Sequence, residues 1–219
     1  MTRDFSTVGV IGLGTMGAGI VEVFARNGID VIAVEVDAAA IEHGRAVLGG
    51  STGRALARAK MTQEEHDALH GRVTYTSDLG DLAACQLVVE AVPEHLDLKK
   101  ELLGKVDAVV STDAILATNT SSLPVTEIAV ATGNPKRVVG MHFFNPVPML
   151  QLVEVIRGLQ TSDETAAEIG QLARDLGKVP AEAHDFPGFV SNRILMPFIN
   201  EAAYALMEGV AEAEARFRL

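Results

Sequence analysis

Residues 8–17 read Val-Gly-Val-Ile-Gly-Leu-Gly-Thr-Met-Gly. The first five are apolar or Gly and predict a buried strand, and apolar residues at helical spacing predict a helix over residues 15–27. Gly12 permits a tight turn, Gly14 lets the backbone approach a pyrophosphate, and Gly17 lets helix and strand pack closely. This order predicts a dinucleotide-binding turn, with its phosphates at the helix start. The residues expected to contact the dinucleotide are Gly12, Leu13, Gly14, Thr15, Met16 and Gly17.

Further strand candidates follow this unit and alternate with longer helical patterns. The strands are expected at 31–35, 87–91, 114–118 and 138–141, and the helices at 38–60, 62–70, 94–109 and 123–131. A strand over 151–156, a helix over 163–176 and a strand over 178–182 follow outside the alternation. The predicted fold class is therefore α/β, a Rossmann-like, doubly wound and mostly parallel sheet with helices on its faces.

The pattern changes after residue 184. His184–Gly188 reads as a linker, and an apolar stripe predicts one long helix over 189–210. We therefore divide the chain into a nucleotide-binding domain, 1–184, and a second part, 185–219, that holds the linker and the first long helix of an incomplete all-α C-terminal domain.

Composition narrows the function classes. The chain has 219 residues, 48% of them hydrophobic, and a formal net charge of −11 without a basic tract, which argues against nucleic-acid binding. No uncharged apolar stretch reaches about 18 residues, so we expect no membrane-spanning helix. The single cysteine, Cys85, lies in an apolar run and cannot form an intramolecular disulfide. With no signal peptide at the N-terminus, a cytoplasmic protein is expected.

Glu35 ends the second predicted strand, 23 residues after Gly12. An acidic group there can hydrogen-bond the adenosine ribose hydroxyls. It would repel a 2′-phosphate by about 1 kcal/mol in water and by about 4 kcal/mol near a protein surface, which favours NAD over NADP tenfold or more. Asp37 is a second candidate, because predicted strand ends are uncertain by a couple of residues.

His142 and Glu154 are the candidate proton-transfer residues. His142 is the only histidine at the predicted carboxyl end of a parallel strand, where open sheets bind ligands. Taken alone, each residue can be explained without a catalytic role: His142 as a hydrogen-bonded core histidine, and Glu154 as a carboxylate between two valines of a strand. A buried carboxylate requires a partner, and a carboxylate that accepts from one imidazole nitrogen leaves the other free as a base. We therefore expect the two to form a pair.

Five segments together resemble the L-3-hydroxyacyl-CoA dehydrogenases, especially the short bacterial 3-hydroxybutyryl-CoA dehydrogenase type. They are Gly12-x-Gly14-x-Met16-Gly17, Asn119-Thr-Ser-Ser122, His142-Phe-Phe-Asn-Pro146, Leu152-Val-Glu-Val155 and Pro187-Gly-Phe-Val-x-Asn-Arg193. The resemblance covers nearly the whole chain. It implies an NAD-dependent oxidoreductase that interconverts (S)-3-hydroxyacyl-CoA and 3-ketoacyl-CoA, with no metal ion and no membrane partner.

The resemblance also assigns roles to individual residues. His142 is implied to be the general base and Glu154 to orient it. Ser121 is implied to lie near both the substrate hydroxyl and the nicotinamide, and Asn192 to hold the substrate oxygen. The implied NAD contacts further along the chain are Glu94, Lys99 and Asn145. The implied CoA contacts are Ser51, Ser121 and Arg58, where the family has Lys in place of Arg.

Family members continue into several more helices, which form the dimer interface and one wall of the acyl pocket. The sequence after residue 210 does not resemble that continuation, so a C-terminally truncated chain is expected, with a homodimer formed through its last helix. Two alternatives stay open: an NAD-binding module of low or no activity, and a related hydroxyacyl-carrier-protein or sugar-acid dehydrogenase.

Overall fold

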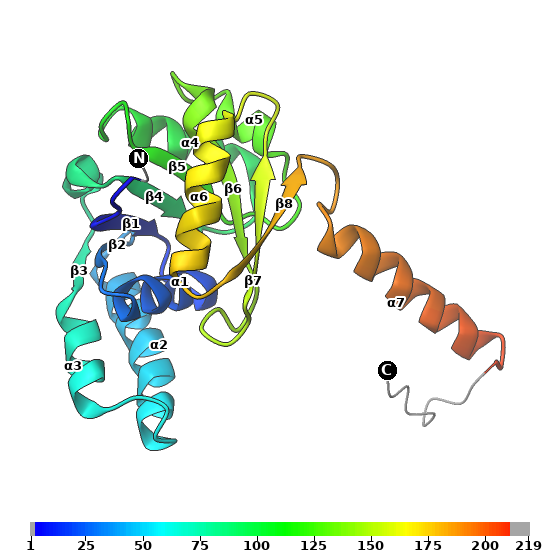
Figure 1. Cartoon of the computed structure of the whole chain (residues 1–219), viewed down its shortest axis with the longest axis horizontal. Coiled ribbons are helices and arrows are strands. Elements are labelled where there is room, and N and C mark those ends of the chain that lie inside the picture. Colours follow the sequence, from blue (N-terminus) through cyan, green and yellow to red (C-terminus); the bar gives the residue numbers. More distant parts are fainter. Residues whose placement is uncertain (1–2, 211–219) are drawn as a thin grey trace.

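A computed structural model describes residues 3–210, which form one eight-stranded sheet with helices on both faces (Figure 1). The strand order is β3-β2-β1-β4-β5-β6-β7-β8, and of these neighbouring pairs only β6 and β7 are antiparallel. The strands are β1 (Thr7–Ile11), β2 (Asp30–Val34), β3 (Val73–Thr76), β4 (Leu87–Glu90), β5 (Ile115–Thr118), β6 (Val138–Phe143), β7 (Leu152–Arg157) and β8 (Val179–His184). The order 3-2-1-4-5-6 is that of the Rossmann fold, as predicted.

The helices connect these strands. They are α1 (Thr15–Arg26), α2 (Ala38–Ala57), α3 (Gln63–Gly71), α4 (Leu96–Asp107), α5 (Val125–Ala129), α6 (Asp163–Asp175) and α7 (Ser191–Met207), with short 3-10 turns at Leu79–Ala84 and Pro135–Arg137. The chain reverses its direction of winding between β1 and β4. The carboxyl ends of these two strands flank the crevice in which open α/β sheets bind ligands.

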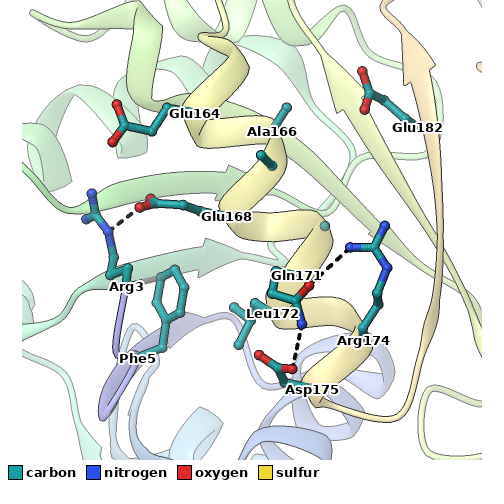
Figure 2. A pocket seen from close by; sticks show the side chains of 12 residues that line it. Arg3, Phe5, Glu164, Ala166, Glu168, Gln171, Leu172, Arg174, Asp175 and Glu182 are labelled. Carbon is teal, nitrogen blue, oxygen red and sulfur yellow. Dashed lines mark hydrogen bonds and ion pairs between the residues drawn. The ribbon is translucent and has the colours of Figure 1, made fainter. Parts of the chain in front are cut away.

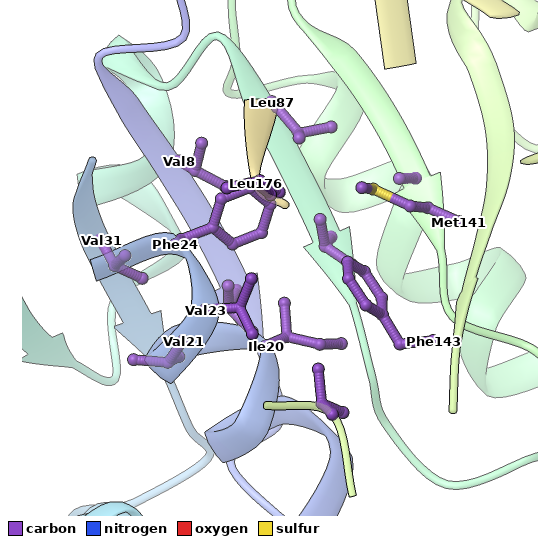
Figure 3. Packing of buried hydrophobic residues seen from close by; sticks show 14 of the residues in the cluster. Val8, Ile20, Val21, Val23, Phe24, Val31, Leu87, Met141, Phe143 and Leu176 are labelled. Carbon is purple, nitrogen blue, oxygen red and sulfur yellow. The ribbon is translucent and has the colours of Figure 1, made fainter. Parts of the chain in front are cut away.

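Alternate side chains of the central strands face two separate cores. In β4, Leu87 and Val89 join the cluster beneath α1 and α6, whereas Val88 joins the cluster beneath α4 and α5. Figure 3 shows the first cluster, to which α1 contributes Phe24 and the carboxyl end of β6 contributes Phe143. Phe143 directly follows His142 in the sequence. Burial of each such side chain stabilises the fold by about 1.5–3 kcal/mol, so the strand ends that carry the site are rigidly held.

The structure differs from the sequence prediction at several element ends. β3 was not expected, because its sequence, Val-Thr-Tyr-Thr, alternates apolar or aromatic residues with threonine and forms no apolar run. The strand lies at the edge of the sheet. The helix expected to reach residue 60 ends at Ala57, since Ala59 has a positive φ of 52°. The last helix begins at Ser191 rather than 189, because Gly188 and Phe189 have φ values of 78° and 48°, which an α-helix cannot include.

Helix α7 projects away from the sheet (Figure 1), and none of its side chains is buried. It presents exposed Ile194, Phe198, Leu206 and other apolar residues to solvent. Within residues 3–210, no helix is both long enough and apolar enough to span a membrane. The predicted division of the chain at residue 185 stays a prediction.

Candidate active site

His142 and Glu154 face each other across the antiparallel pair β6–β7. The strand register places them directly opposite, so their side chains leave the same face of the sheet as neighbours. His142 Nδ1 lies 2.8 Å from Glu154 Oε2, and both side chains are buried. A carboxylate is an acceptor, so Nδ1 carries the hydrogen and Nε2 stays free to act as a base. The expected pair is therefore present.

The second oxygen of Glu154 fastens the start of α7. Oε1 accepts hydrogen bonds from the backbone nitrogens of Val190 and Ser191, at 3.2 and 2.8 Å, and from Ser191 Oγ at 2.9 Å. Burial raises the pKa of Glu154, but the hydrogen bonds from His142 and Ser191 lower it further, so the net pKa lies below its usual value. The carboxylate is therefore ionised at neutral pH, as a partner for an imidazolium must be.

Ser121 and Asn192 come together beside this pair. Asn192 Nδ2 donates to the backbone oxygen of Ser121 at 3.1 Å, which links the first turn of α7 to the loop after β5. Glu94 Oε1 accepts from the Ser121 backbone nitrogen at 2.9 Å, from its Oγ at 3.3 Å and from Thr120 Oγ1 at 2.5 Å. Burial raises the pKa of Glu94, but the bonds from Thr120 and Ser121 and the nearby Lys99 bring it below its usual value.

A cavity of about 460 Å³ joins these groups. The predicted residues His142, Ser121, Asn192, Asn145 and Glu94 all line it. Glu154 lies behind His142, and the rings of Phe144 and Phe189 stand 4.5 and 6.1 Å from the imidazole centroid. The structure therefore places the expected proton-transfer and oxygen-holding groups around one space, with an apolar support behind the base.

The glycine turn has the predicted geometry. Gly12 has a φ of 88°, and a Cβ on Gly17 would lie 1.6 Å from the Gly12 carbonyl oxygen, so neither tolerates a side chain. A Cβ on Gly14 would meet no atom within 4 Å, which leaves the open side of the turn clear. Thr15 and Met16 form the first turn of α1, whose free N–H groups face this opening.

Glu35, and not Asp37, faces the turn. Glu35 Oε1 accepts from the Leu13 backbone nitrogen at 2.5 Å, and both Glu35 and Gly14 line a cavity of about 750 Å³. The Asp37 carboxylate instead caps α2 by accepting from the Ala40 nitrogen at 2.8 Å. The second candidate for the ribose contact is therefore engaged in a helix cap.

Lys99 lies beneath the site instead of on its surface. It is fully buried, and its Nζ lies 2.9 Å from both carboxylate oxygens of Glu90 and 3.4 Å from Glu94 Oε2. Thr118 also donates to Glu90. A direct contact of Lys99 with NAD stays a prediction, and the structure gives it a role in holding Glu94. Sequence reasoning missed Glu90, whose signal was a carboxylate that ends an otherwise apolar strand.

Ser51 and Arg58 line a third cavity, of about 530 Å³, between α1, α2 and the loop after β6. Its other charged groups are Glu22, Arg26, Arg54 and Lys60. The loop residues Pro146, Pro148 and Met149 complete the lining, and the neighbouring Asn145 lines the His142 cavity. One loop therefore borders both spaces. Lys178 Nζ holds it by donating to the carbonyl oxygens of Val147 and Leu150, at 2.5 and 2.8 Å.

A hollow of about 670 Å³ lies beside α6 and contains no predicted site residue. Figure 2 shows Arg3 paired with Glu168 at 3.0 Å, and Gln171 bonded to Asp175 at 2.8 Å. The Arg3–Glu168 ion pair therefore fastens the start of the described chain to α6.

Comparison with known proteins agrees with this geometry. Residues 7–186 match the family model of the NAD-binding domain of 3-hydroxyacyl-CoA dehydrogenase, and residues 188–215 match that of its C-terminal domain. A "Probable 3-hydroxybutyryl-CoA dehydrogenase" of Deinococcus radiodurans is 50% identical over 94% of this chain and 74% of its own length. A protein of the same description from Bacillus subtilis is 44% identical over 97% of this chain and 74% of its own length.

A solved structure extends the match to three dimensions. The (S)-3-hydroxybutyryl-CoA dehydrogenase PaaH1 of Ralstonia eutropha superposes with a TM-score of 0.93 at 43% identity, covering 96% of this chain and 75% of that one. Sequence, fold and site geometry therefore agree: this chain belongs to the 3-hydroxyacyl-CoA dehydrogenase family.

Proposed function

We propose that this chain is an NAD-dependent dehydrogenase that interconverts short-chain (S)-3-hydroxyacyl-CoA, such as 3-hydroxybutyryl-CoA, and 3-ketoacyl-CoA. The observation that carries the proposal is the bond between His142 and Glu154 on a cavity that Ser121 and Asn192 share. The names of the relatives support the same reaction.

The residues present fit NAD. The open side of Gly14 and the free N–H groups of α1 suit a pyrophosphate, and Glu35 faces the same cavity with a charge that repels a 2′-phosphate. NAD, when bound, supplies the acceptor for the hydride. Glu94 and Asn145 line the space between this turn and His142, where the nicotinamide end is expected.

In the direction of oxidation, Nε2 of His142 takes the proton of the substrate 3-hydroxyl as C3 loses its hydride. Glu154 stabilises the imidazolium that forms, because its carboxylate already accepts from Nδ1. Ser121 and Asn192 hold the substrate oxygen by hydrogen bonds. In the reverse direction, the His142 imidazolium returns the proton to the developing alkoxide.

The cavity at Ser51 and Arg58 is the proposed site of the CoA nucleotide. Four cationic side chains line it, which suits the phosphates of CoA and favours a CoA thioester over a free sugar acid. Turnover of acetoacetyl-CoA should accordingly exceed turnover of free acetoacetate and of acetoacetyl bound to a carrier protein. A preference for either of the latter would support the related dehydrogenase instead.

The decisive experiment compares the chain with its His142→Gln variant. Acetoacetyl-CoA-dependent oxidation of NADH should fall by roughly 10²–10⁴-fold, the usual contribution of a general acid–base group. NADH affinity, measured by fluorescence titration, should stay within about twofold. An unchanged rate in the variant would refute the role of His142, and a wild-type chain that binds NADH without turnover would be the low-activity module.

We also propose that the chain forms a homodimer through α7 and acts in the cytoplasm. The exposed apolar face of α7 supports self-association. Burial raises the pKa of the Cys85 thiol to about 11, which suits an unreactive core residue. Sedimentation at several protein concentrations tests the dimer, and a monomer throughout would contradict it.

A further inference from the structure

Asn119 follows β5 directly and lies at the centre of the carboxyl edge of the sheet. Its backbone nitrogen donates to the Glu90 carbonyl at 2.9 Å, and its side-chain Oδ1 accepts from the Phe143 backbone nitrogen at 2.9 Å. It therefore joins the end of β4 to the residue that follows His142. Asn119 also lines the 460 Å³ cavity that holds His142, Ser121 and Asn192.

The contact with Phe143 fixes the orientation of the amide. A backbone N–H can only donate, so the group that faces it must be the oxygen of Asn119, and the NH₂ group must point the other way. Within residues 3–210, this NH₂ group has no hydrogen-bond partner. Asn119 thus offers two N–H donors to the cavity from a side chain whose rotation is locked.

The neighbouring groups have less to offer. The Ser121 hydroxyl donates to Glu94 Oε1 at 3.3 Å, so it must give up this bond to donate to a substrate oxygen. Asn192 Nδ2 uses one hydrogen on the Ser121 carbonyl and keeps one. His142 presents Nε2 as an acceptor to the 3-hydroxyl and donates from Nε2 only as an imidazolium, in the direction of reduction. The reaction, however, brings carbonyl oxygens into this space, and each of them requires donors.

We propose that Asn119 is a ligand-contacting residue of the site, whose amide N–H groups donate to a carbonyl oxygen bound in the cavity. The inference rests on the proposed function for the identity of the ligands. Two of them carry such an oxygen close to the reacting atoms: the carboxamide of the nicotinamide and the 3-keto group of the acyl thioester. Both present the same chemistry, and binding measurements separate them.

The test uses Asn119→Asp and Asn119→Ala in the full chain. The aspartate can still accept from the Phe143 nitrogen but presents an oxygen where the NH₂ group stood, whereas alanine removes both contacts. Asn134→Asp is the matched control, because the Asn134 Oδ1 also accepts from a backbone nitrogen, that of Lys136, at 3.3 Å, and Asn134 does not line the cavity. The readouts are melting temperature and the affinities for NADH, for ADP-ribose and, with NAD bound so that no hydride can be transferred, for acetoacetyl-CoA.

Asn119→Asp should melt close to the unmodified chain yet lose about tenfold or more in affinity for one carbonyl-bearing ligand, the size of one lost hydrogen bond of about 1.4 kcal/mol. A loss for NADH with ADP-ribose unaffected identifies the carboxamide, and a loss for acetoacetyl-CoA alone identifies the keto group. Asn119→Ala should show the same ligand loss together with a lower melting temperature. Asn134→Asp should show neither.

Two results would overturn the inference. The first is an Asn119→Asp variant that binds NADH and acetoacetyl-CoA within twofold of the unmodified chain, which would leave Asn119 a purely structural link to Phe143. The second is a loss in the aspartate variant that the alanine variant does not share, since that would be charge repulsion. All of these readouts are equilibrium measurements, so they hold even if the chain proves unable to turn over acetoacetyl-CoA.

Discussion

Glu154→Gln tests how one carboxylate serves two elements. Its Oε2 accepts from His142 and its Oε1 accepts three hydrogen bonds from Val190 and Ser191. Glutamine has almost the same volume but a single oxygen. If that oxygen faces Ser191, the NH₂ group faces His142 Nδ1, and Nδ1 must then accept a hydrogen bond. The imidazole hydrogen therefore moves to Nε2, and Nε2 can no longer take a proton from the substrate. If the oxygen faces His142, the NH₂ group meets backbone donors.

Either arrangement is costly. Glu154 meets a full opposite charge only when His142 has taken the proton, so the loss of a buried ion pair, about 3–5 kcal/mol, falls on the proton-transfer step. At 1.36 kcal/mol per factor of ten, this predicts a fall in kcat of roughly 10²–10⁴-fold. The assay is acetoacetyl-CoA-dependent oxidation of NADH, with Glu164→Gln as the control because Glu164 is an exposed carboxylate of α6. A Glu154→Gln enzyme with kcat within threefold of the unmodified chain would refute the assignment.

Stability gives an independent readout. The folded-state pKa of Glu154 is depressed, because the bonds from His142 and Ser191 outweigh the effect of burial. A depressed carboxyl pKa contributes stability that is present above the unfolded value, about 4.3, and is lost as the pH falls through the folded value. The unmodified chain should therefore melt well above Glu154→Gln at pH 7, and the gap should narrow below about pH 4. A gap that is constant with pH would contradict an ionised Glu154 carboxylate in the folded chain.

Two further substitutions test the ligand sites. Glu35→Gln keeps an acceptor for the Leu13 nitrogen but removes the negative charge. The preference for NAD over NADP, measured as a ratio of dissociation constants, should therefore fall about tenfold. An unchanged ratio would show that another residue contacts the ribose. Arg58→Ala should raise KM for acetoacetyl-CoA about fivefold, the value of one exposed ion pair of about 1 kcal/mol, and leave KM for the acetoacetyl thioester of N-acetylcysteamine unchanged. Equal changes in KM for both thioesters would show that the CoA nucleotide does not bind in this cavity.

Local patterns predicted much of this molecule. The glycine turn follows from residues close in sequence, and the geometry at Gly12 and Gly17 agrees with the roles that spacing gave them. The His142–Glu154 pair followed from a chemical requirement, since neither group is stable alone in an apolar strand. The pair forms because β7 runs antiparallel to β6, so that His142 and Glu154, twelve residues apart in the sequence, stand directly opposite each other.

Contacts between distant segments could not be predicted in the same way. The pattern Glu94 to Lys99 did not show that Lys99 would be buried against Glu90, because that contact requires β4 and α4 to pack first. The choice between Glu35 and Asp37 likewise depended on where β2 ends and α2 is capped. The amide orientation of Asn119 depends on a residue 24 positions away.

The first turn of α7 explains how so exposed a helix can still belong to the site. Ser191 is bound to Glu154, which accepts from His142, and Asn192 is bound to the carbonyl of Ser121 in the loop after β5. Two neighbouring residues thus fasten α7 both to β7 and to the loop after β5, next to the cavity proposed to take the substrate oxygen. A displacement of α7 would therefore change the support of His142 and the position of Asn192 together. The homodimer proposed above would cover the apolar side chains of α7 and would therefore act on the same two bonds.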